Sequence, residues 1–246
     1  MRIAVLTLVY NEEDTIGGVI KNWEGLVEKH LVLHSDKPWH GEELPPDETE
    51  NIVKRFKHTE FIRIQWDSET QQRNWGLGRL YDFDYVLIVD ADEFYERKDC
   101  EKIINYLGKE KNKYDNVDCY RVSKINTYFK DLDYRLDPRD THEPVIALNP
   151  KKIVFTEHRC VNTQCQIPFN LIMHHTTYCR NRNRLASKLE QFEHHDSVKS
   201  FWIEEVYDKW NPQVAEGMDN LRAYGHENSK AIYDPAPQEI RFLISP

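Results

Sequence analysis

Apolar residues in the first hundred positions gather into short runs, and these runs alternate with segments of mixed polarity. The runs at residues 3–9 and 85–89 are almost continuously apolar and rich in β-branched residues, which is typical of strands buried on both faces of a parallel sheet. Shorter runs predict strands at 31–33 and 61–65, and the segments between and after the runs predict helices at 12–23, 47–56, 68–80 and 99–107. This order predicts an α/β fold with a mostly parallel sheet flanked by helices.

Two of the predicted helices carry a start signal. Asn11 precedes three acidic residues at 12–14, which suits an N-cap followed by an acidic first turn. Ser68 and Gln71 have the spacing of a capping box. Ligands of such sheets bind at the carboxyl ends of the strands, so the residues that follow each strand are the first candidates for a site.

The pattern changes beyond about residue 114. Residues 118–128 and 152–156 predict strands on either side of the polar stretch 131–144, and residues 183–210 have helical periodicity. The segment 240–244 predicts a final strand after the proline-rich stretch 234–237. Without an internal repeat or a linker, we expect a single domain, 1–246. Its first half is about 1–113, and its second half is about 114–246 with helices near the end.

Composition narrows the classes of protein that fit. The chain has 246 residues with 39% hydrophobic and 12% aromatic residues, which excludes a disordered chain. Its formal net charge of −9 disfavours duplex nucleic acid as a partner. No apolar run approaches the length that spans a bilayer, so we expect no membrane span. Five cysteines in no secreted framework predict reduced thiols and a cytoplasmic location.

The strongest chemical signal is Asp90-Ala91-Asp92, directly after the strand predicted at 85–89. The repulsion between two such carboxylates is relieved by a divalent cation, and hard oxygen ligands suit Mn²⁺ or Mg²⁺ bridging phosphate oxygens. A solvated acidic turn is the alternative interpretation of this tripeptide. The sequence around it favours the metal site.

Three segments together resemble glycosyltransferase family 2. They are Val5-Leu6-Thr7-Leu8-Val9-Tyr10-Asn11-Glu12-Glu13, Gln72-Arg73-Asn74-Trp75-Gly76-Leu77 and the strand that ends in Asp90-Ala91-Asp92, in the family's order and at about its spacings. The resemblance covers about residues 1–110. It implies a GT-A fold, with a Rossmann-like nucleotide-sugar half joined to an acceptor half. The implied activity is metal-dependent, inverting transfer of a sugar from a nucleotide-diphosphate sugar to a hydroxyl acceptor.

The resemblance also assigns residues to the donor site. The nucleotide sugar would be bound by Thr7, Val9, Tyr10, Asn11, Glu12, Asp36, Arg73, Asp90 and Ala91. Asp36 is the candidate for reading the base, which implies a UDP- or TDP-type donor, and Arg73 would reach the base or the diphosphate. Asp92 is the expected catalytic residue that holds the metal, with Asp90 on the ribose or the metal.

His175 is the third predicted metal ligand. Relatives of this family carry a late histidine followed by an aromatic and a basic residue, and here Tyr178 and Arg180 follow His175 at a spacing that suits it better than His174. One or both histidines could instead only form hydrogen bonds at a strand end. A rival hypothesis is a structural zinc site, in which Cys160, Cys165 and Cys179 bind zinc together with one of these histidines.

The general base is harder to assign, because the family's usual Glu-Asp pair is absent from the second half. An inverting transferase needs a group that takes the proton of the acceptor hydroxyl. We expect Glu157 in this role, and the alternatives are Asp137, Asp140, His142, Glu143 and His158.

Aromatic and basic residues supply further candidates. Sugar rings stack on aromatic faces, and Trp39 and Tyr95 are the aromatic residues expected near the ligand. The basic cluster Arg180, Arg182, Arg184 and Lys188 is either a solvated helix start or a site for an anionic substrate.

Two other functions compete with glycosyl transfer. A nucleotidyltransferase would also place carboxylates and Mg²⁺ beside a nucleotide, but the first loop, Tyr10-Asn11-Glu12-Glu13, lacks the glycines and lysine that such enzymes carry there. A degenerate, non-catalytic binding protein of the same fold is the third hypothesis. The presence of Arg73, Asp90 and Asp92 argues against it.

Overall fold

The computed structural model describes residues 1–110, 117–140, 142–192, 195–213, 218–225 and 228–244. The expected boundary between the two halves, near residue 113, lies outside these residues. Within them, one sheet has six strands in the order β3-β2-β1-β4-β9-β6. These strands are β1 (Ile3–Val9), β2 (Lys29–Ser35), β3 (Thr59–Ile64), β4 (Tyr85–Ile88), β6 (Cys119–Arg121) and β9 (Val145–Leu148).

This sheet is mostly parallel, as predicted. The neighbouring pairs among β3, β2, β1 and β4 are all parallel, whereas β9 is antiparallel to both β4 and β6. Every residue of β1 is buried, which explains its continuous apolar run. Ile3 and Val5 face one apolar cluster, and Ala4, Leu6 and Leu8 face another. Both faces of the sheet are therefore covered.

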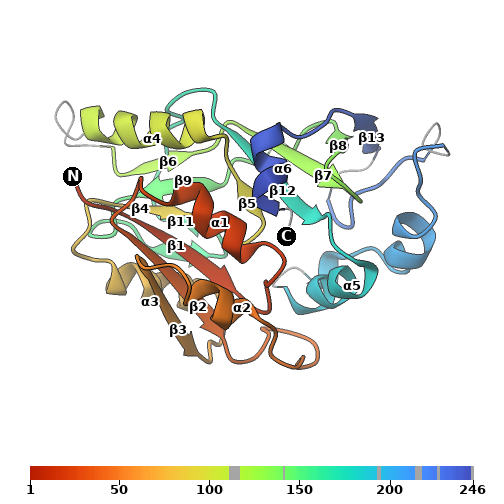
Figure 1. Ribbon diagram of the computed structural model, residues 1–246, viewed down its shortest axis with the longest axis horizontal. Coiled ribbons are helices and arrows are strands. Elements are labelled where there is room, and N and C mark those ends of the chain that lie inside the picture. The colour runs from red at the N-terminus through yellow and green to blue at the C-terminus, as the bar shows by residue number, and fades with distance from the viewer. Residues whose placement is uncertain (111–116, 141, 193–194, 214–217, 226–227, 245–246) are drawn as a thin grey trace.

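Helices supply the two covering layers (Figure 1). The helices α1 (Ile16–Trp23) and α4 (Arg97–Glu110) pack on the Ile3 side, and α3 (Glu69–Arg79) packs on the Leu6 side. The short helix α2 (Thr49–Val53) contacts α1. Gly76 allows α3 to approach the sheet, because a Cβ at this position would lie 2.7 Å from a methyl carbon of Leu6.

A second sheet has the order β13-β8-β7-β12-β5. It comprises β5 (Glu93–Phe94), β7 (Lys124–Phe129), β8 (Tyr134–Asp137), β12 (Ile172–Tyr178) and β13 (Lys230–Tyr233). A hairpin of β10 (Phe155–Glu157) and β11 (Cys160–Val161) contacts α3. The helix α5 (Arg182–Gln191) follows β12, then a 3₁₀ turn (His195–Ser197) and a π-helical turn (Ile203–Tyr207). No helix in the described ranges is long and apolar enough to cross a membrane.

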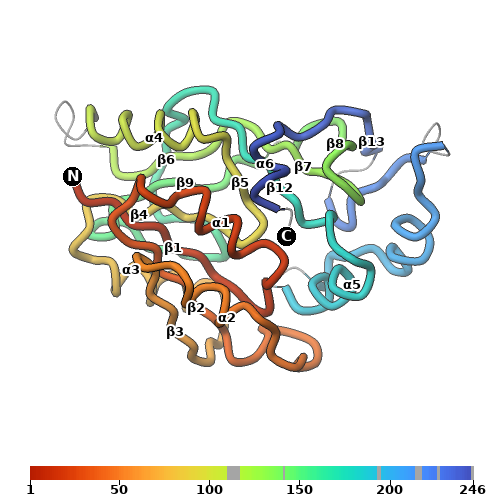
Figure 2. The backbone as a smooth tube through the Cα atoms, in the orientation of Figure 1, coloured from red at the N-terminus to blue at the C-terminus, as the bar shows by residue number. Residues whose placement is uncertain are grey.

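The prediction of a final strand at 240–244 is wrong. This segment is part of the helix α6 (Gln238–Ile244), which begins where the carbonyl of Pro237 accepts hydrogen bonds from the amides of Ile240 and Arg241. Although they are at opposite ends of the chain, α6 lies against α1 (Figure 2). Gly18 makes the contact possible, because a Cβ there would lie 2.1 Å from the carbonyl oxygen of Leu243. Proline at this place starts a helix instead of preventing one.

Two local predictions also need correction. Asn11 does not cap α1: it has φ 54°, and α1 begins at Ile16 after Thr15, without a side-chain cap. The polar stretch 131–144 contains the strand β8. Leu136 of this strand is buried although the residues on either side of it, Arg135 and Asp137, are polar. The capping role of Ser68 is confirmed, because its side chain accepts a hydrogen bond from the amide of Gln71.

The expectation of reduced thiols does not hold for one pair of cysteines. Cys119 on β6 and Cys165 form a disulfide, while Cys100, Cys160 and Cys179 are free. The disulfide removes Cys165 from the rival zinc site. Across the residues with described positions, no group of three His, Cys, Asp or Glu side chains is arranged to hold a metal by itself.

Candidate active site

A cleft of about 690 Å³ opens beyond the carboxyl ends of β1 and β4. Its walls come from the loop after β1, from residues 90–93, from β12 and from α5. Because β1 and β4 are parallel neighbours, Glu12 and Asp92 follow strands that end at the same edge of the sheet. The three segments that resemble the transferase family therefore meet in one cavity, since Glu12, Arg73 and Asp92 all line it.

The pairing of β12 with β5 brings a distant histidine into this cleft. His175 is the partner of Glu93 in the antiparallel register, and both the amide and the hydroxyl of Thr176 donate hydrogen bonds to the Asp92 carbonyl. His175 Nε2 lies 3.6 Å from Asp92 Oδ1. His174 points elsewhere: it is buried and its Nδ1 lies 2.9 Å from the Tyr128 hydroxyl. The structure thus places His175, and not His174, beside the carboxylate.

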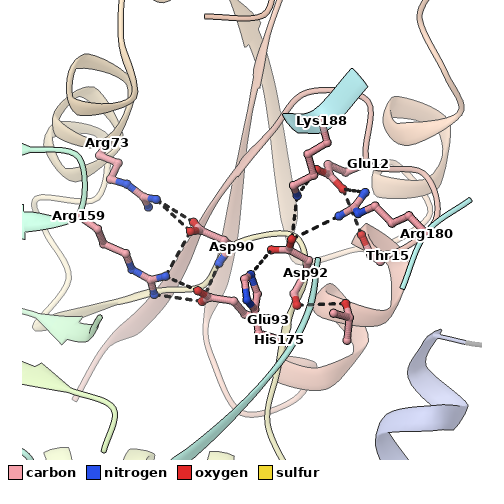
Figure 3. Close-up of polar contacts among 11 residues, drawn as sticks. Glu12, Thr15, Arg73, Asp90, Asp92, Glu93, Arg159, His175, Arg180 and Lys188 are labelled. Atoms are coloured by element: carbon pink, nitrogen blue, oxygen red, sulfur yellow. Dashed lines mark hydrogen bonds and ion pairs between the residues drawn. The ribbon is translucent and has the colours of Figure 1, made fainter. Parts of the chain in front are cut away.

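Asp90 and Asp92 turn to opposite sides (Figure 3). Asp90 is held by Arg73 Nη2 at 2.9 Å and by Arg159 Nη1 at 3.2 Å. Arg159 also donates hydrogen bonds to both carboxylate oxygens of Glu93 and to the carbonyl of Ile88. Burial opposes ionisation of Asp90, but Arg73 and Arg159 outweigh it and lower the pKa of this carboxyl. Asp90 is therefore a charged anchor for two arginines.

Asp92 has a separate set of partners. Lys188 Nζ lies 2.8 Å and Arg180 Nη2 lies 3.5 Å from its Oδ2 atom, while Oδ1 faces His175. Burial works against the charge, yet Lys188, His175 and Arg180 together hold the pKa of Asp92 well below its usual range. In return, Asp92 outweighs the burial of His175 and raises the pKa of that imidazole. Asp92 is the ionised carboxylate at the centre of the cleft.

The residues present fit a divalent cation as two donors of a larger set. Ligands of an octahedral ion at roughly 2.1 Å lie about 3 Å apart when adjacent and about 4 Å apart when opposite. The separation of 3.6 Å between Asp92 Oδ1 and His175 Nε2 lies between these two values, so the two atoms would have to approach by roughly 0.6 Å to become adjacent ligands. Because no third His, Cys, Asp or Glu side chain of the described residues joins this pair, a bound anion or water would fill further positions. Asp90, which the sequence also predicts as a metal ligand, is instead paired with Arg73 and Arg159 and is not part of this donor pair.

Several residues predicted for the donor line the cleft. Val9, Tyr10, Asn11, Glu12 and Ala91 are among them. Asn11 donates its amide hydrogen to the Pro45 carbonyl at 3.0 Å, which leaves Asn11 Oδ1 buried without a partner.

Other buried polar atoms on the cleft wall also lack partners. These are Trp39 Nε1, Arg73 Nη1, Thr127 Oγ1, Arg180 Nε and Arg222 Nε. Buried polar groups in folded proteins are nearly always hydrogen-bonded, so these atoms are available to water or to the polar groups of a ligand in the cleft.

The structure does not bring four of the predicted residues to the cleft. Thr7 is a buried residue of β1, and its hydroxyl lies 2.8 Å from Nε2 of His30 on β2. Asp36 faces Arg63 at 3.6 Å, and Tyr95 is buried in the core against the ring of Trp23. Glu157 lies on the hairpin with 77% of its side chain exposed and pairs with the adjacent His158.

The second half of the chain contributes Asp140 and Arg222 to the cleft. Asp140 Oδ2 accepts a hydrogen bond from Arg222 Nη1 at 3.2 Å, and Oδ1 accepts one from the amide of His142. Arg222 is 4% exposed and also donates to the Pro138 carbonyl. Asp140 was one of several alternatives for a general base, while no sequence signal singled out Arg222 or Arg159.

The basic cluster of the sequence divides into two groups. Arg180 and Lys188 point into the cleft, whereas Arg182 is an exposed residue that pairs with Glu204 and Asp208. Arg184 contacts Asp47 at 2.7 Å and so ties α5 to the loop before α2.

Comparisons with known proteins give matches only at the level of structure. Neither a protein-family model nor a curated protein matches the chain. It is similar to S. aureus TarS residues 1–349 in complex with UDP, with 14% identity, a TM-score of 0.38, and coverage of 54% of this chain and 37% of that chain. It is also similar to glucosyl-3-phosphoglycerate synthase from Mycobacterium tuberculosis in complex with Mn²⁺, UDP and glucosyl-3-phosphoglycerate. There the identity is 18%, the TM-score is 0.36, and the match covers 52% of this chain and 44% of that chain. The chain thus spans less than half the length of these matched structures.

Proposed function

We propose that this protein is a metal-dependent glycosyltransferase of the GT-A fold, which moves a sugar from a nucleotide-diphosphate sugar to a hydroxyl acceptor. The observation that carries the proposal is the convergence in one cleft of Glu12, Arg73 and Asp92, from the three segments that resemble glycosyltransferase family 2, with His175 from a distant strand. No observation favours a nucleotidyltransferase or a non-catalytic binding protein over it.

Asp92 and His175 are the residues that would hold a Mn²⁺ or Mg²⁺ ion. When bound there, the cation neutralises charge that develops on the leaving nucleoside diphosphate. Carboxylate oxygens suit both ions, and the imidazole nitrogen favours Mn²⁺ over Mg²⁺. Arg180 and Lys188 lie on the same side of Asp92 and supply further positive charge at this end of the cleft.

The nucleoside would lie along the loop after β1. Tyr10, Asn11 and Trp39 line this part of the cleft, and two of them present an unpartnered acceptor and donor, Asn11 Oδ1 and Trp39 Nε1. A uracil or thymine base has both a donor and acceptors on its imide edge. We therefore propose a UDP- or TDP-type donor, with Asn11 and Trp39 in place of Asp36 at the base.

Asp140 is the general base in this proposal, in place of Glu157. Of the carboxylates on the described cleft wall, Glu12, Glu69, Asp90, Asp92 and Glu93 lie in the first half, and Asp140 lies in the second. Arg222 and the amide of His142 fix both oxygens of Asp140. A carboxylate held in this way can take the proton of an acceptor hydroxyl as the sugar carbon is attacked from the opposite face to the diphosphate, which inverts its configuration.

A ligand panel tests the function. Nucleotide-diphosphate sugars and nucleoside triphosphates are compared by thermal shift with Mn²⁺, with Mg²⁺ and with EDTA. UDP-sugars come first, since both similar structures were solved with UDP. We expect a metal-dependent stabilisation by one class of nucleotide sugar, and loss of it in Asp92→Asn because an amide is a poorer ligand for a hard cation. Equal stabilisation in EDTA, or by the triphosphates alone, would contradict the proposal.

A further inference from the structure

Four charged side chains in the cleft form a closed ring of ion pairs. Glu12 contacts Arg180 at 2.6 Å and Lys188 at 2.9 Å, and Asp92 contacts Lys188 at 2.8 Å and Arg180 at 3.5 Å. Glu12 and Asp92 are 9% and 5% exposed, and Arg180 is 2% exposed. Two negative and two positive charges cancel, so the ring has no net formal charge.

Lys188 is the member of this ring that can leave it. Its side chain is 25% exposed, and it extends from α5 into the cleft on a flexible stem. Arg180 is more deeply buried and has a strong contact with Glu12, while its Nε atom has no partner. Lys188 is therefore free to exchange its partner, and the Nε–H group of Arg180 is available as a further hydrogen-bond donor.

Because the ring has no net charge, the divalent cation and the diphosphate are expected to bind more favourably together than singly. A diphosphate group alone adds negative charge beside Glu12 and Asp92, and a divalent cation alone adds positive charge beside Arg180 and Lys188. Each step disturbs a buried set of paired charges, which is costly where the dielectric constant is low. When both ligands enter together, their charges cancel, and every side chain of the ring can keep an opposite charge beside it.

Building on the nucleotide-sugar function proposed above, we propose that Lys188 is a phosphate-binding residue. In the ligand-free protein it forms ion pairs with Asp92 and Glu12 instead. On binding, Lys188 moves from Asp92 Oδ2 to the diphosphate, and the divalent cation takes its place beside Asp92 and His175. Arg180 stays on Glu12 and turns its unpartnered Nε to the same phosphates. The cation and the diphosphate thus bind together, and their charges replace the ion pair between Lys188 and Asp92.

The exchange has a signature that a purely structural lysine lacks. Lys188 competes with the metal in the absence of nucleotide, and it supports the diphosphate in the presence of metal. Its replacement by methionine keeps most of the apolar stem and removes the charge. Lys188→Met should therefore strengthen binding of the metal alone and weaken binding of the diphosphate to the metal-loaded protein.

The test uses free Mn²⁺, measured by electron paramagnetic resonance, together with calorimetric titration of UDP. In the wild-type protein we expect UDP to raise the affinity for Mn²⁺ at least about tenfold, and Mn²⁺ to raise the affinity for UDP by the same factor, as linkage requires. In Lys188→Met we expect at least about threefold tighter Mn²⁺ binding without nucleotide, and at least about tenfold weaker UDP binding at saturating Mn²⁺. Arg182→Met is the matched control, because it removes a positive charge from the exposed start of the same helix and should change neither affinity.

Each outcome decides between the alternatives. If UDP binds with Mn²⁺ but Lys188→Met leaves the affinity for Mn²⁺ alone unchanged or weaker, the exchange is refuted and the proposed function stands. If wild-type protein binds UDP equally with and without Mn²⁺, both the exchange and the metal dependence of the proposed function are refuted, and the positive charge at the diphosphate comes from Lys188 and Arg180 alone. If wild-type protein binds no nucleoside diphosphate under any condition, both proposals fail.

Discussion

Arg159 is expected to be the residue on which the geometry of the cleft depends most. It is a side chain of the β10–β11 hairpin, 10% exposed, and it reaches Asp90, Glu93 and two backbone carbonyls, those of Ile88 and Val145. Arg159→Met keeps most of its apolar stem and removes every one of these contacts. Glu93, whose side chain is 4% exposed, is then left as a buried carboxylate without its main partner.

The magnitude follows from this loss of a buried partner. Removing one member of a buried ion pair costs about 3–5 kcal/mol, so we expect Arg159→Met to lower the free energy of unfolding by about that amount. Burial already raises the pKa of Glu93 while Arg159 opposes the shift, so the variant should raise this pKa further. A carboxyl with a raised pKa in the folded state takes up a proton on folding. The deficit of the variant should therefore shrink as the pH falls.

Urea unfolding, followed by the fluorescence of the six tryptophans, measures the effect. Arg182→Met is the control: it breaks exposed contacts with Glu204 and Asp208, for which we expect at most about 1 kcal/mol. Adding Glu93→Gln to Arg159→Met removes the unpaired charge and should restore about 1–3 kcal/mol. A loss below about 1 kcal/mol in Arg159→Met would refute the reasoning, because it would mean that Glu93 needs no buried partner.

The remaining predictions concern the base and the buried histidines. Asp140→Asn should lower the rate of sugar transfer by about 10²–10⁴-fold while the Kd for UDP stays unchanged, and a rate within about tenfold of wild type would rule out Asp140 as the base. Burial lowers the pKa of His30 to about 3 and the pKa values of His34 and His174 to about 4, so these side chains stay neutral in the folded protein at pH 5. Because the unfolded chain protonates them below about pH 6.5, stability should fall on acidification by about 1.4 kcal/mol per pH unit for each histidine. Urea unfolding between pH 6 and 5 should show a slope that is smaller by about one such increment in His30→Asn, and an identical slope would contradict the assignment.

The sequence predicts the first half of the fold well for a physical reason. A strand buried on both faces needs an unbroken apolar run, and β1 and β4 have such runs. In α6, by contrast, a short apolar segment fits a strand and a helix equally. This segment is helical because Pro237 starts the helix and because Gly18 allows the helix to pack closely on α1. The hydrophobic periodicity of the sequence reveals neither.

The site is predictable only as far as local motifs extend. Asp92 follows a recognisable strand, and His175 is expected from the family resemblance that Tyr178 and Arg180 support; both line the cleft. Glu157 lies two positions before Arg159 in the β10–β11 hairpin, and His158 between them has a left-handed backbone conformation, with φ 45°. Arg159 enters the cleft and Glu157 faces solvent. Such a reversal of direction within three residues is a property of the turn and leaves no sequence motif.

The function proposed for Asp92 is to support transfer of a sugar from a nucleotide-diphosphate sugar. Its most direct test is the release of nucleoside diphosphate from a panel of such donors, with water or added hydroxyl compounds as acceptor, by wild-type protein and by Asp92→Asn. We predict release from one donor class with Mn²⁺ by the wild-type protein, abolition by EDTA, and no release by the variant. No release from any donor with either metal, or equal release by Asp92→Asn, would contradict the account.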